Sequence, residues 1–117
     1  MSKIQIWHNP RCSKSRDALN LLESEGISAE VIKYLDTKLT YENIKELLNS
    51  LGISARELMR TKEDIYKELD LKNENDEDKL ILAMVENPRL IERPIVIKDG
   101  KAVIGRPIEN VINLVRG

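Results

Sequence analysis

The order of strand and helix signals at the start of the chain constrains its fold more than any other feature. An alternating run from Lys3 to Trp7 predicts a first strand, which the pair Asn9-Pro10 ends. A helical pattern then covers Ser13 to Glu25, and Gly26 is a helix-ending glycine. Ala29 to Tyr34 predicts a second strand. Because strand–helix–strand connections of this kind are right-handed, the order predicts a βαβ unit.

The middle of the chain is predicted to be helical. Apolar residues recur at helical spacing from Ile44 to Leu51. The segments 54–57 and 61–64 both have the spacing of a capping box, which marks the start of a helix. A further helix is predicted over Asp76–Glu86, and the polar stretch Lys72–Lys79 is expected to be a solvated loop that runs into it. We therefore expect a helical insertion over about 38–90.

The end of the chain predicts a hairpin followed by a helix. Apolar triplets at 95–97 and 102–104 flank Asp99-Gly100, which is typical of a tight β-hairpin. Pro107 suits the first position of a final helix. The whole order predicts one α/β domain over 1–117. We expect a thioredoxin-like fold with three layers, α/β/α, a mixed central sheet, the helical insertion, and a C-terminal hairpin plus helix.

The turn between the first strand and the first helix carries the residues typical of a reactive thiol. Cys12 is the one cysteine of the chain, so no internal disulfide can form, and no cysteine–histidine set has zinc spacing. A helix N-terminus favours the thiolate, which is the nucleophilic form. His8, Lys14 and Arg16 lie nearby and would lower the pKa of the thiol further. Ser15 is expected to cap the helix or to donate a hydrogen bond to the thiolate.

Three arginines lie at predicted element boundaries and are candidates for anion binding. Arg60 follows a capped segment, Arg93 precedes Pro94, and Arg106 stands between the hairpin and the last helix. Guanidinium groups bind tetrahedral oxyanions through forked, charge-assisted hydrogen bonds. Three of them converging on Cys12 would bind a phosphate-like anion beside the thiolate. In a thioredoxin-like fold, Pro94 would be the cis-proline that faces the cysteine.

Composition excludes several classes of function. The chain has 19 basic and 20 acidic residues, which gives no footprint for general nucleic-acid binding. Phenylalanine is absent and there is one tryptophan, so a base-stacking platform is not expected. No segment has the pattern of a signal peptide or the apolar length of a membrane span, and a lone cysteine fits a reducing compartment. We expect a cytoplasmic monomer with no bound cofactor and no membrane or nucleic-acid partner.

Four segments in the same order resemble the glutaredoxin-dependent arsenate reductase family, and together they cover essentially the whole chain. The resemblance implies that Cys12 is the nucleophile, with His8 as a catalytic neighbour. The four segments are His8-Asn9-Pro10-x-Cys12-x-x-Ser15-Arg16, Glu57-Leu58-x-Arg60-Thr61, Ile91-x-Arg93-Pro94-Ile95 and Ile104-Gly105-Arg106-Pro107. By the same resemblance, the oxyanion-binding arginines are Arg60, Arg93 and Arg106.

The resemblance also implies a mechanism. The thiolate of Cys12 attacks the arsenic of arsenate, and a thioarsenate ester forms. Glutathione, as co-substrate, attacks the ester, and glutaredoxin resolves the mixed species so that arsenite is released. Well-studied members have Gly-Thr directly after the cysteine, where this chain has Ser13-Lys14, so Lys14 adds a cation beside the thiol.

Three other functions fit the sequence less well. An Spx-like regulator would bind RNA polymerase, but such proteins usually carry Cys-x-x-Cys, and here Ser15 takes the second position. A monothiol reductase of glutathione adducts would need a glutathione groove rather than three anion-binding arginines. A cysteine phosphatase needs Cys-x5-Arg, whereas the first arginine after Cys12 is Arg16.

Overall fold

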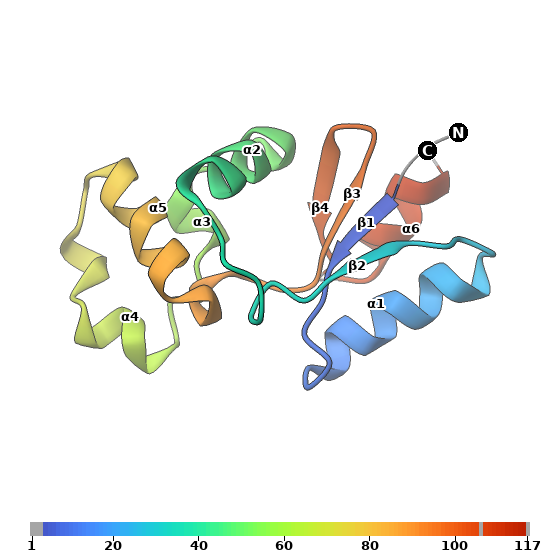
Figure 1. Cartoon of the computed structure of the whole chain (residues 1–117), viewed down its shortest axis with the longest axis horizontal. Coiled ribbons are helices and arrows are strands. Elements are labelled where there is room, and N and C mark those ends of the chain that lie inside the picture. The colour runs from blue at the N-terminus through green and yellow to red at the C-terminus, as the bar shows by residue number, and fades with distance from the viewer. Residues whose placement is uncertain (1–3, 106, 117) are drawn as a thin grey trace. The chain divides into compact units, whose positions relative to one another are not determined.

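The computed structural model describes residues 4–105 and 107–116. The chain divides into two compact units (Figure 1). The first unit is formed by residues 1–37 and 93–117, and the second by residues 38–92. The organisation as one domain with an insertion over about 38–90 stays a prediction.

The first unit is built on a mixed four-stranded sheet with the order β2-β1-β3-β4. Strand β1 pairs with β2 in parallel and with β3 antiparallel, and β3 pairs antiparallel with β4. The strands are β1 (Ile4–Trp7), β2 (Glu30–Ile32), β3 (Ile95–Lys98) and β4 (Lys101–Ile104). Asp99 and Gly100 form the turn between β3 and β4 with φ of 51° and 81°. Two left-handed central residues suit a tight hairpin turn, so the predicted hairpin is confirmed.

Two helices, α1 (Ser13–Ser24) and α6 (Glu109–Arg116), cover one face of this sheet. Ile6 of β1 is paired with Val96 of β3, so both side chains point to the same face. One core cluster contains this pair together with Ile4, Ala18, Leu22 and Val111. The α/β class and the mixed sheet are therefore as the sequence predicts.

The start of α6 differs from the prediction. The helix begins at Glu109, two residues after Pro107. The N–H of Asn110 donates to the carbonyl of Pro107 at 3.0 Å, which makes a turn ahead of the helix. The side-chain amide of Asn110 donates to the carbonyl of Ile104 at 3.0 Å. Because of this turn and the hydrogen bond from Asn110 to the end of β4, the helix begins two residues later than predicted. The assignment of Pro107 to the first helical position was therefore wrong.

The second unit is helical. Its elements are α2 (Tyr41–Leu51), α3 (Ala55–Leu58), α4 (Asp64–Glu68), α5 (Glu77–Glu86) and two short 3₁₀ helices, η1 (Leu71–Asn73) and η2 (Pro88–Leu90). The fully buried side chains include Ile44, Leu58, Ile81 and Met84. The helices predicted around Ile44–Leu51 and over Asp76–Glu86 are confirmed.

One of the two predicted capping boxes is present. Ser54 caps α3: its hydroxyl accepts from the N–H of Glu57, and the Glu57 carboxylate accepts from the N–H of Ser54 at 3.2 Å. Thr61 caps no helix, because α4 begins at Asp64 with Glu63 before it. A turn in which the N–H of Glu63 donates to the carbonyl of Arg60 occupies this stretch instead. The predicted capping box over 61–64 was therefore wrong.

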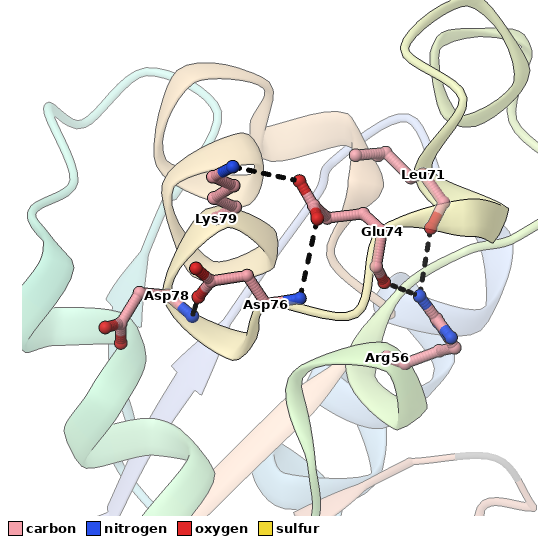
Figure 2. A network of polar contacts seen from close by, with 6 residues as sticks. All are labelled: Arg56, Leu71, Glu74, Asp76, Asp78 and Lys79. Atoms are coloured by element: carbon pink, nitrogen blue, oxygen red, sulfur yellow. Dashed lines mark hydrogen bonds and ion pairs between the residues drawn. The ribbon is translucent and has the colours of Figure 1, made fainter.

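A polar network orders the stretch before α5, where the sequence predicts a solvated loop (Figure 2). The guanidinium of Arg56 donates to the carbonyl of Leu71 at 2.9 Å and to the carbonyl of Glu74. The Glu74 carboxylate pairs with Lys79 at 4.0 Å. The Asp76 carboxylate accepts from the N–H of Asp78 at 2.9 Å and so caps α5. These contacts explain why part of the predicted loop forms η1.

Candidate active site

The turn between β1 and α1 is held by short-range hydrogen bonds. The carbonyl of Asn9 accepts from the N–H of Cys12 at 3.0 Å, and its side-chain oxygen accepts from the N–H of Arg11 at 3.0 Å. The guanidinium of Arg16 donates to the carbonyl of Pro10 at 2.8 Å. The Arg16 side chain therefore closes the turn from the helix side.

Cys12 stands at the N-terminus of α1 and favours its thiolate. Its backbone is extended, with φ −98° and ψ 122°, and the residue is 8% exposed. Burial raises the pKa of the Cys12 thiol, but the backbone N–H groups of Ser15 and Lys14 and the guanidinium of Arg93 lower it by more. The net pKa is below its ordinary value. Lys14 thus acts on the thiol through its backbone.

His8 is buried and hydrogen-bonded to Ser15. Its Nδ1 lies 2.7 Å from the hydroxyl of Ser15, which also accepts from the N–H of Asn9 at 3.0 Å. Burial lowers the pKa of His8, and the positive charges of Lys33 and Arg16 lower it further, against the hydrogen bond of Ser15. The imidazole is therefore neutral near pH 7. A neutral His8 contributes no positive charge to the thiol, and its side chain is hydrogen-bonded to Ser15.

Arg93 and Pro94 come directly before β3, beside the cysteine turn. The Arg93–Pro94 peptide bond is cis, as the thioredoxin-like interpretation expects. The carbonyl of Pro94 accepts from the N–H of Gly105 at 2.7 Å. A Cβ on Gly105 would lie 2.8 Å from Cγ of Pro94, so only glycine fits there without a shift. The Arg93 guanidinium acts on Cys12 through a side-chain hydrogen bond and through its charge.

Arg60 belongs to the second unit, where two carboxylates hold its guanidinium. Its Nη1 pairs with Glu63 at 2.8 Å, and its Nε lies 3.5 Å from the Glu92 carboxylate. Its backbone N–H donates to the carbonyl of Leu90 at 2.7 Å, next to the bridge between Met59 and Ile91. The i, i+3 spacing could have indicated Glu63 from the sequence. Glu92 is brought to Arg60 by the bridge, which no local pattern signals.

Arg106 lies outside the described residues. Among residues 4–105 and 107–116, no three histidine, cysteine, aspartate or glutamate side chains are grouped as a metal site would need. In the same residues no helix has the length and apolar character to cross a membrane. The structure thus gathers Cys12, Ser15, His8 and Arg93 in one unit, and the roles of all predicted site residues stay predictions.

Known proteins match this chain along nearly its whole length. The model of the ArsC family matches residues 7–114. An arsenate reductase of Neisseria meningitidis (strain MC58) is 57% identical over 113 residues, which cover 95% of this chain and 97% of that protein. YfgD of Escherichia coli K12 is 55% identical over 115 residues, which cover 97% of each. The solved arsenate reductase of Vibrio cholerae superposes with a TM-score of 0.92 at 50% identity, covering 95% of this chain and 96% of that one.

A mixed sheet with a cis-proline before β3 and a cysteine at the start of the first helix defines a thioredoxin-like protein. The solved relative has the same fold over almost all of the chain. With the family model matched from residue 7 to residue 114, the chain belongs to the ArsC family.

Proposed function

We propose that the protein is an arsenate reductase in which Cys12 is the nucleophile. The observation that carries the proposal is the electrostatic setting of Cys12 at the start of α1. Backbone N–H groups and the Arg93 guanidinium lower the pKa of the thiol against the opposing effect of burial. A guanidinium beside the sulfur also offers charge-assisted hydrogen bonds to an incoming oxyanion. The relatives named arsenate reductase, at up to 57% identity, support arsenate as that oxyanion.

The reaction begins with a bond between sulfur and arsenic. The thiolate of Cys12 attacks the arsenic of arsenate, and one arsenate oxygen leaves as water with protons from the solvent. Arg93, and by the family resemblance Arg60 and Arg106, would hold the remaining oxygens. Their charges would offset the repulsion between an anionic nucleophile and an anionic substrate.

The reduction itself needs a second thiol. Reduction of arsenic(V) to arsenic(III) takes two electrons, and the chain has one cysteine. We assign this role to glutathione, whose sulfur attacks Sγ of Cys12. The electron pair of the sulfur–arsenic bond stays on arsenic, arsenite leaves, and a disulfide joins Cys12 to glutathione. A thiol of glutaredoxin then cleaves this disulfide and restores Cys12.

A coupled assay tests the proposal. Arsenate-dependent oxidation of NADPH is measured with glutathione, glutaredoxin and glutathione reductase. We expect turnover that requires arsenate, and a Cys12→Ser variant with less than about 1% of it, because loss of a covalent catalyst costs several orders of magnitude. Omission of glutaredoxin tests the electron donor separately. Absence of arsenate-dependent turnover, or a Cys12→Ser variant that is folded and active, would contradict the proposed function.

A further inference from the structure

The proposed function, on which this inference rests, needs an external thiol that must bind close to Cys12. The first unit has a cavity of about 280 Å³ that could hold it. This volume is near the lower end of the range of roughly 300–1,000 Å³ for small-molecule sites. The cavity is lined by Lys14 and Asp17 of α1, by Gly105, Pro107 and Ile108 ahead of α6, and by Glu109 at the start of α6.

The cavity lies next to the cysteine turn along the chain. Lys14 is two residues after Cys12, so their Cα atoms are at most about 7.6 Å apart. On the other wall, the N–H of Gly105 donates to the carbonyl of Pro94 at 2.7 Å. Pro94 follows Arg93, which acts on the thiol. An extended tripeptide spans about 10 Å, so one seated in the cavity can present a central thiol to Cys12.

The charges on the walls are of both signs. Lys14 supplies an ammonium group, and Asp17 and Glu109 supply carboxylates. None of these three side chains forms a hydrogen bond or an ion pair with any residue that the structure describes. Pro107 and Ile108 add apolar surface between them. Such walls complement a ligand that carries both carboxylate and ammonium groups.

We propose that this cavity binds a peptide thiol of the glutathione class, which carries one ammonium group and two carboxylates, before its sulfur attacks Cys12. Lys14 pairs with a carboxylate of the ligand, and Asp17 and Glu109 hold its ammonium group. The bound thiol gives its proton to the solvent, and its sulfur bonds to Sγ of Cys12. The sulfur–arsenic bond breaks, and its electron pair goes to arsenic.

A binding experiment tests the site without arsenate. S-Methylglutathione, which has no free thiol, is titrated into the ¹⁵N-labelled protein. We expect shifts of the amide signals of Lys14, Asp17, Ile108 and Glu109. The variants Asp17→Asn and Glu109→Gln should each weaken binding by about 5-fold, the size expected when an exposed charge pair is lost. Glu23→Gln, a carboxylate on the same helix outside these walls, is the matched control and should bind as the wild type does.

Kinetics give a second readout. In Asp17→Asn and Glu109→Gln, the KM for glutathione should rise by about 5-fold, with the KM for arsenate unchanged. The KM for 2-mercaptoethanol, which has neither charge, should not change. The site is overturned if S-methylglutathione moves none of the cavity signals, or if both variants keep the wild-type KM for glutathione. If the wild type binds S-methylglutathione there but reduces no arsenate, the site stands and the proposed function fails.

Discussion

Ser15 connects the residues around the thiol through its hydroxyl and its backbone N–H. Its hydroxyl oxygen accepts from the N–H of Asn9 at 3.0 Å and lies 2.7 Å from Nδ1 of His8. Its backbone N–H lowers the pKa of Cys12. Because the oxygen already accepts one hydrogen bond, its own hydrogen is available to His8, whose Nδ1 accepts it when that nitrogen is unprotonated. In this geometry His8 acts on the cysteine turn through Ser15.

The first prediction at this scale concerns the ionisation of Cys12. The rate of alkylation by iodoacetamide follows the thiolate fraction, so its midpoint in pH reports the pKa of the thiol. Because the N–H groups of Ser15 and Lys14 and the charge of Arg93 favour the thiolate, the midpoint should be lower in the native protein than in the urea-unfolded chain. The measurement is a pH profile of the alkylation rate in both states.

Two arginine variants control this measurement. Arg93→Gln removes a group that lowers the pKa of Cys12, so its midpoint should move toward that of the unfolded chain. Arg11→Gln changes an exposed side chain next to the cysteine and should leave the midpoint where it is. A native midpoint equal to or above the unfolded one would show that burial dominates.

The second prediction concerns His8 and stability. The lowered pKa means that the unfolded chain takes up a proton at higher pH than the folded protein. The contribution of His8 to the free energy of unfolding is therefore fully present above about pH 6.5 and is lost as the pH drops through the lowered pKa. Urea unfolding at pH 7.5 and 5.5 should show this loss. His8 is the one histidine in the chain, so His8→Gln should remove most of the difference. A wild type equally stable at both pH values would contradict it.

At the scale of elements, the two candidate capping boxes make a matched pair. Ser54 caps α3 reciprocally with Glu57, whereas Thr61 caps no helix. Ser54→Ala should lower the free energy of unfolding by about 1 kcal/mol, and Thr61→Ala by much less. Urea unfolding of both variants gives the comparison. Equal losses would mean that the hydroxyl of Ser54 is not what stabilises the start of α3.

The sequence predicted those elements whose signals are local. The hairpin at Asp99-Gly100 needs left-handed backbone at both central residues, which the residue types indicate. The helix after Cys12 and the end of α2 at Gly52 follow likewise from capping and periodicity. The 3₁₀ helix η1 was missed because it follows Asp70, a non-glycine residue at φ 52°, and is held by Arg56 from outside the segment.

The site was predictable to a similar degree. The residues after β1 share one turn, so their closeness to Cys12 follows from sequence spacing. The hydrogen bond between His8 and Ser15 did not follow, because it depends on which way a strand-end histidine turns. Nor did the pairing of Arg60 with Glu92, which depends on a bridge between Met59 and Ile91, distant in sequence.

At the scale of the whole molecule, two of the arginines predicted to bind the anion, Arg60 and Arg93, belong to different units. Arg93 opens the returning segment of the first unit, directly after the second unit ends at Glu92. Arg60 lies within the second unit, with its Nη1 and Nε held by Glu63 and Glu92. Nη2 of Arg60 contacts none of the described residues, so its two N–H donors remain for a ligand.

Replacement of Arg60 and of Arg93 by lysine tests whether both residues bind the anion. Lysine keeps the charge but loses the planar fork, so it cannot hold two carboxylates in the Arg60 geometry and still present a donor to an anion. Arg60→Lys and Arg93→Lys should each lower kcat/KM for arsenate by about 10-fold or more. Arg11→Lys, on the exposed turn, and Arg116→Lys, which pairs with Glu25, should change it by less than about 2-fold. If Arg60→Lys reduces arsenate like the wild type while Arg93→Lys fails, the anion is bound by the first unit alone, and Arg60 serves only to hold Glu63 and Glu92.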